Sequence, residues 1–380
     1  MKAELLESFA SWSNIIGDIL RCIVDKIHSI QDRVRMGVVC RSWHALLKDE
    51  KIDFPICLML AAKENSDRRC FNIDAKKIIL ELDLPEIRER RCWGTPFGWL
   101  VTLGLDGEIR LFNPLSRASL SLPSMHTFNH IACYTPEYSR LYLIDKVLLS
   151  SSPTSPDAII MIIWGFGMYE DKTLAFAKPD DQEWTQIFCD YALDDVICFN
   201  GNFFAACVEG RLFICEDLNR PSPKIVEFAP PPPTIHRGHK KYIVDLSGDL
   251  CMITRDVHRY ELSYDNGRVE DANLTEGFEV FKLDLHTKNW EKILSLNGHS
   301  VFLGNCCTFS VLPTDHPSCK SNCIYFTDDD NRFYPEASAS DIGIYNCNNK
   351  AVEYIEDEDD EVPDLRSPFS PPLWIKLCLH

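Results

Sequence analysis

The hydrophobic positions near the N-terminus follow the period of a helix. Between residues 15 and 27, isoleucine, leucine and valine recur at offsets of 0, 1, 4, 5, 8, 9 and 12. This spacing puts them on one broad stripe of an α-helix, which Ser13 or Asn14 can cap at its start. Residues 32–36 suit a short second helix, and the apolar positions within 38–47 form one side of a third.

These roughly 40 helical residues are too few to bury a complete core by themselves. The stripe on the first helix is also wider than two short neighbouring helices can cover. Part of it must therefore meet another surface, which is either a partner protein or the rest of this chain. The pattern alone does not decide between these two.

From about residue 70 the pattern changes to short β-rich runs separated by Gly, Asn, Asp and Pro turns. A loose repeat, an apolar strand followed by a polar turn and an anchored strand, begins near residues 109, 174, 211, 279 and 342. One small sheet cannot bury both of its faces, so repeated sheets of this kind stack in a ring. Trp184 and Trp290 are expected to fill gaps between neighbouring sheets, as structural residues.

The fold prediction is therefore a small all-α helical domain followed by a large all-β domain, a β-propeller of six or seven blades. We place the helical domain at 10–50, a linker at 51–70 and the β domain at 71–380. The closing strand is expected near residues 373–375.

Composition makes some functions unfavourable. The 380 residues carry a formal net charge of −18, which disfavours broad nucleic-acid binding because phosphate would be repelled. Two short basic runs, at 88–91 and 236–241, are interpreted as solvated loops. The longest apolar run is about half a membrane span, and no secretory signal is visible. We expect no membrane association and a location in the cytoplasm, the nucleus or both.

The residues with chemical potential lack a catalytic arrangement. The 17 cysteines include no C-x-x-C pair, so free thiols are expected and a zinc site is a minor alternative. His236 and His239 lack supporting ligands in the sequence. The run 328–330 is interpreted as a polar hairpin turn rather than a Ca²⁺ site. No nucleophile elbow, phosphate-binding loop or zinc-protease motif occurs, so no catalytic residue, cofactor or metal is predicted.

The helical segment resembles an F-box. The resemblance rests on WSNIIGDIL from Trp12, DRVR from Asp32 and VCRSW from Val39. The chain departs from the family at Ile16, where a proline is usual; proline suits the first helical turn because its φ is preset. The resemblance implies that these helices bind the Skp-type adaptor of a cullin–RING ligase. The implied contact residues are Ile15, Ile16, Ile19, Leu20, Ile23, Val39, Cys40, Arg41 and Trp43.

The β-rich region resembles the plant KIB-type F-box/kelch-related proteins, whose C-terminal part is the domain of unknown function 295. The likeness is carried by GEIRLFNPLSRASLSLP from Gly107, FEVFKLDLHTKNWEKI from Phe278, NCIYFTDD from Asn322 and SPPLWI from Ser370.

Together the two resemblances imply a non-catalytic substrate-recognition subunit of an SCF-type (Skp–cullin–F-box) ubiquitin ligase, whose β domain binds an unknown target protein. Two alternatives remain open: a β-propeller enzyme, and a ligase-independent binding protein with a degenerate F-box.

Overall fold

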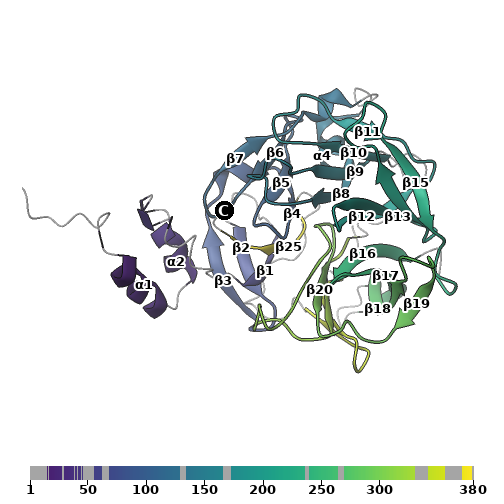
Figure 1. Ribbon diagram of the computed structural model, residues 1–380. Helices are drawn as coiled ribbons and strands as arrows, with labels where there is room; N and C mark the ends of the chain where they lie inside the picture. The colour runs from purple at the N-terminus through teal and green to yellow at the C-terminus, as the bar shows by residue number, and fades with distance from the viewer. Residues whose placement is uncertain are drawn as a thin grey trace, which may run out of the picture.

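The computed structural model describes most of the chain (Figure 1). The described residues are 15, 17–27, 30–37, 39–40, 42–43, 45, 55–61, 68–128, 134–165, 173–235, 239–263, 269–329, 341–355 and 370–378. No helix within these ranges is long and apolar enough to cross a membrane.

The described strands form six sheets, the blades of a β-propeller, arranged around a ring (Figure 1). Five blades have four antiparallel strands each, and the sixth has five. The strands of blades 1 to 3 are β25 (Leu373–Lys376), β1 (Ile56–Met59), β2 (Arg68–Asn72) and β3 (Lys77–Leu82); β4 (Arg91–Gly94), β5 (Leu100–Leu103), β6 (Ile109–Phe112) and β7 (Ser119–Ser121); and β8 (Ile144–Leu149), β9 (Ile160–Trp164), β10 (Thr173–Ala177) and β11 (Thr185–Ile187).

In blades 4 and 5, strands that are consecutive in the chain lie side by side in the sheet. Blade 6 differs, because β20 lies between β21 and β22 and pairs with β22 in parallel. The strands of blades 4 to 6 are β12 (Leu193–Phe199), β13 (Asn202–Cys207), β14 (Leu212–Glu216) and β15 (Lys224–Ala229); β16 (Lys240–Leu246), β17 (Asp249–Ser263), β18 (Val269–Leu283) and β19 (Trp290–Ile293); and β20 (Ser300–Leu303), β21 (Phe309–Val311), β22 (Cys323–Phe326), β23 (Gly343–Asn346) and β24 (Ala351–Tyr354). The predicted propeller is confirmed, with six blades.

The ring is closed by its two ends. Strand β25, near the C-terminus, pairs with β1, in a register that runs from Ile56↔Lys376 to Met59↔Leu373. The side chain of Trp374, in β25, is almost fully buried. The closing strand therefore lies where the sequence predicts it.

The predicted linker at 51–70 contains β1 and the start of β2, which belong to blade 1, so the linker prediction is wrong there. The physical reason is that β1 is only four residues long. One of its two pairing partners, β25, comes from the other end of the chain, so no local repeat marks it as a strand.

Packing between blades uses the tryptophans that the repeat pattern singled out. Trp184 is buried and stacks near Phe128, and its Nε1 donates to the carbonyl of Pro123 at 2.8 Å. Trp290 Nε1 donates in the same way to the carbonyl of Pro230 at 2.6 Å. Each indole thus ties the outer strand of one blade to the end of the preceding blade, which is the predicted structural role.

Two helices precede the propeller and lie beside β3 (Figure 1). They are α1 (Gly17–Lys26) and α2 (Ile30–Gly37), and α2 contacts β3. Arg33 Nε donates to the carbonyl of Ile27 at 2.7 Å, which fixes the turn between them. Half of the residues of the predicted third helix, within 38–47, lie outside the described residues. Short elements between blades are α4 (Pro136–Tyr142) and the 3₁₀ turns η2 (Pro85–Ile87) and η3 (Met125–Thr127).

Candidate functional site

The apolar stripe of α1 is divided between the interior and the surface. Leu20 and Val24 are buried in one cluster with Met36 and Trp43, and this cluster continues into blade 1. Because residues four apart lie one above the other on a helix, Leu20 and Val24 form the inward edge of the stripe. The sequence left open whether this face meets a partner or the same chain, and for this edge it meets the same chain.

The other edge of the stripe is exposed. Ile19 leaves 50% of its surface to solvent, and Val39, which follows α2, leaves 58%. Large exposed apolar side chains on short helices are typical of sites that a second protein covers. We call Ile19 and Val39 the helix surface.

Seven of the nine residues implied by the resemblance are described, and they separate into three groups. Leu20 and Trp43 are buried, Ile15, Ile23 and Cys40 are partly buried against the same cluster, and Ile19 and Val39 are exposed. Ile16 and Arg41 lie outside the described residues.

A buried polar network joins the inner strands of blades 3, 4 and 6. Lys146 on β8 forms an ion pair of 3.2 Å with Asp195 on β12, and both are almost fully enclosed. Lys146 also donates to the Gly304 carbonyl at 3.0 Å, and Thr308 donates to Asp195 at 2.7 Å. Burial, the largest single effect, would lower the pKa of Lys146, but Asp195, Cys306 and Asp329 together outweigh it and raise that pKa, so the ammonium keeps its charge.

A second buried network joins blades 5 and 6. Arg255 on β17 donates to Asp329 at 2.9 Å and to Asp341 at 2.8 Å. Tyr242 donates to Asp329 at 2.7 Å, and Lys240 pairs with the same carboxylate at 2.9 Å. Burial alone would raise the pKa of Asp329, but Lys240 and Arg255 together lower it. Asp328 and Asp329 begin the connection from β22 to its antiparallel partner β23, as the turn prediction for 328–330 expects, but the Asp329 carboxylate is a buried ion-pair partner and not a solvated turn residue.

The basic runs are also not simply solvated loops. Arg90 is buried and pairs with Asp106 at 3.2 Å, while the Lys241 side chain is enclosed and donates to the Val208 carbonyl. Lys240 is mostly covered by its pairing with Asp329. The prediction failed because these cations find their carboxylate and carbonyl partners in turns and connections distant along the chain, which sequence spacing does not reveal.

The described cysteines are free thiols. Burial raises the pKa of Cys307 and of Cys251 to about 12. Such thiols stay neutral at neutral pH and are poor nucleophiles. They act as small apolar side chains, as their positions in apolar runs indicated.

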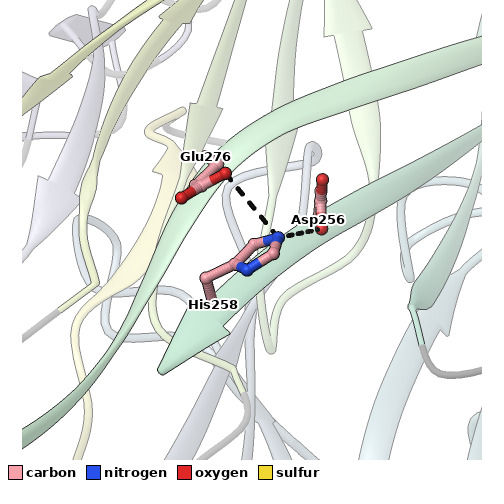
Figure 2. A group of neighbouring side chains, drawn as sticks. All are labelled: Asp256, His258 and Glu276. Carbon is pink, nitrogen blue, oxygen red and sulfur yellow. Dashed lines mark ion pairs between the residues drawn. The ribbon is translucent and has the colours of Figure 1, made fainter. Parts of the chain in front are cut away.

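One group of described side chains has the composition of a metal site. Asp256, His258 and Glu276 offer one ligand atom each, all within 4.8 Å of one another (Figure 2). The sequence did not single out Asp256, His258 or Glu276, because Glu276 lies 18 residues from His258 and only the strand register brings them together.

Comparisons with known proteins agree with this architecture. A model of the KIB1-4 beta-propeller matches residues 70–346. A putative F-box protein of Arabidopsis thaliana, At5g55150, is 23% identical over 90% of this chain and 92% of its own length. The Arabidopsis F-box protein SKIP23 is 22% identical over 96% of this chain and 95% of its own length.

Similarity to solved structures is weaker. The structure of U3-55K matches with a TM-score of 0.33 and 8% identity, covering 72% of this chain and 67% of that chain. The family match, in contrast, runs from β2 to β23 and covers most of the ring. The chain belongs to the KIB1-4 β-propeller family.

Proposed function

We propose that this chain is the substrate-recognition subunit of an SCF-type E3 ubiquitin ligase. In this proposal, residues 10–50 form an F-box that docks on a Skp-type adaptor, and through it on a cullin–RING ligase. The propeller then binds a target protein. The observation that carries the proposal is the exposed helix surface, Ile19 and Val39, in a chain whose relatives along nearly its full length are named F-box proteins.

The inward edge of α1 gives the proposal its mechanism. Leu20, Val24, Met36 and Trp43 share one cluster with blade 1, and α2 contacts β3. A packed contact of this kind holds the propeller in a defined orientation relative to the helices. Ubiquitin transfer to a held target is favoured by proximity and orientation, so the chain itself need supply no reacting group.

The buried networks favour an adaptor over a propeller enzyme. Asp195 accepts hydrogen bonds from Thr308 and from the backbone amides of Val196 and Ile243, in addition to its ion pair with Lys146. A carboxylate engaged in this way holds strands together and has little capacity left for a substrate. The network therefore has the character of a structural cross-link between blades.

The proposal is tested by placing charge on the helix surface. The double variant Ile19→Asp, Val39→Asp should lose Skp-adaptor binding, because each burial of an aliphatic side chain contributes about 1.5–3 kcal/mol, or roughly 10- to 100-fold in affinity. Binding is measured by calorimetry and by co-purification from cells that express both chains. Leu20 and Trp43 are left unchanged, because they are buried within this chain and their loss would unfold it.

Leu294→Asp is the matched control. Leu294 is 75% exposed at the end of β19, so the variant makes the same chemical change on the propeller. It should bind the adaptor like the wild type. Unchanged binding by the double variant, with an unchanged circular dichroism spectrum, would refute the docking mechanism. A wild-type chain that binds no Skp-type adaptor would favour the ligase-independent alternative.

A further inference from the structure

The hairpin β17–β18 of blade 5 is much longer than its neighbours. Both strands have 15 residues, and their pairing runs from Cys251↔Lys282 to Ser263↔Val269. The pairing has one irregularity, where Asp256 pairs with Gly277 and the next residue, Val257, pairs with Thr275. Glu276 is therefore the extra residue of a β-bulge.

The bulge explains why three polar side chains meet on one face. Side chains alternate along a strand, so Asp256 and His258 point to the same side of β17. A bulge re-aims the side chain of its extra residue, and Glu276 turns toward this pair (Figure 2).

The other face of the same hairpin segment is buried. Arg255 and Thr275 point into the network with Asp341, to which Thr275 donates at 2.6 Å. These buried hydrogen bonds hold the backbone of β17 and β18 in place next to Asp256, His258 and Glu276. The ligand face itself remains reachable from solvent, because His258 and Glu276 are exposed.

The distances between the side chains fit a shared ion. His258 Nε2 lies 3.2 Å from Asp256 Oδ1 and 3.6 Å from Glu276 Oε2. Ligands about 2.0–2.1 Å from a tetrahedral ion are separated by roughly 3.4 Å, which lies between these two values. One imidazole nitrogen thus faces two carboxylates, as expected of ligands that converge on one point.

Two neighbours contact the group. His239 Nε2 lies 3.1 Å from the same Asp256 Oδ1 and pairs with that carboxylate, but His239 is not one of the three side chains whose ligand atoms lie within 4.8 Å of one another. The Tyr260 hydroxyl donates to Glu276 Oε1, which leaves Oε2 for the site. Hydrogen-bonded partners of this kind orient metal ligands in known metal sites.

We propose that Asp256, His258 and Glu276 bind a divalent transition-metal ion of the zinc class on the outside of the propeller. Imidazole nitrogen and carboxylate oxygen are ligands that zinc accepts in a tetrahedral arrangement, and a site with three protein ligands leaves the fourth position to water. The two carboxylates and a neutral imidazole give the site a formal charge of −2, which a divalent cation balances.

The test uses Co²⁺ as a spectroscopic substitute for zinc, added to the full-length chain purified with chelator. Co²⁺ bound by nitrogen and oxygen absorbs in the visible range without the thiolate charge-transfer band that cysteine ligands produce, so the site is distinguished from the 17 cysteines. One equivalent should bind with this spectrum and be displaced by Zn²⁺. His258→Ala and Glu276→Gln should each weaken binding by more than the roughly 10-fold that loss of an outer-shell partner costs.

The matched controls are His286→Ala and Glu291→Gln, which make the same changes at exposed residues elsewhere in blade 5. Both should keep the wild-type Co²⁺ spectrum and affinity. A spectrum with only the thiolate band would overturn the proposal. So would a nitrogen–oxygen spectrum that persists unchanged in His258→Ala and in Glu276→Gln.

Discussion

At the scale of single residues, the propeller is unusual in how it uses buried charge. Arg255 is enclosed and contacts two carboxylates, Asp329 and Asp341, that flank the blade 6 strands. Its Nε also donates to Thr275 at 2.7 Å. A buried ion pair is costly to desolvate, but removing one member leaves the others uncompensated and is more costly still.

We therefore expect Arg255→Met to destabilise the chain by about 3–5 kcal/mol, since Asp329 and Asp341 lose their shared partner. The measurement is the urea midpoint of unfolding. Arg211→Met is the control: Arg211 pairs with Glu227 at 2.8 Å on the surface, and such a pair contributes less than about 1 kcal/mol. Equal midpoints for both variants would show that the buried network does not stabilise the fold.

At the scale of elements, neighbouring blades approach each other closely at the inner strands β4 and β25. A Cβ added to Gly94 would lie 2.0 Å from the backbone oxygen of Trp374 and 3.0 Å from Leu373. The backbone of one strand cannot move away without breaking its own ladder to β1. Glycine at this position is therefore required by the closeness of two strands and not by its backbone angles.

Gly94→Ala should lower the thermal midpoint, with a cost at or above the roughly 1–3 kcal/mol typical of overpacking. Gly277→Ala is the matched control, because a Cβ there meets only Tyr345 ring atoms at 3.8 Å, an ordinary contact. Differential scanning fluorimetry on both variants checks this. A Gly94→Ala chain as stable as Gly277→Ala would contradict the close approach of β4 and β25.

At the scale of the whole molecule, the last strand closes the ring. β25 and the residue after it supply four buried apolar side chains, with Trp374 packed edge-to-face against Phe302 and Tyr325 of blade 6. The other three are Leu373, Ile375 and Leu377. At about 1.5–3 kcal/mol each, their loss approaches the 5–15 kcal/mol that stabilises a typical folded protein.

Deleting residues 370–380 should therefore abolish cooperative unfolding and yield aggregated protein, as judged by size-exclusion chromatography and thermal scanning. Deleting only 379–380, which lie beyond β25, should have no effect. A chain lacking 370–380 that is monomeric and melts at the wild-type temperature would show that β1 does not need its C-terminal partner.

Much of this architecture is predictable because it depends on local pattern. The 3.6-residue spacing of residues 15–27 predicts α1, and the repeated strand–turn–strand pattern, together with Trp184 and Trp290, predicts stacked blades. Local periodicity reports which face of an element is buried, so it identifies elements and fold class without knowledge of their partners.

Only the tertiary structure decided which surfaces the apolar faces of these helices and strands pack against. Leu20 and Ile19 are adjacent and equally apolar, yet one is buried and the other exposed, because only packing places a neighbour on one side of α1. Asp329 is a buried partner of Arg255. Strand β1 pairs with β25, which comes from the far end of the chain. Glu276 lies beside Asp256 and His258 only because of a bulge in the pairing of β17 with β18. These contacts depend on strand register and ring closure, which join residues distant in sequence, and no local pattern encodes such distances.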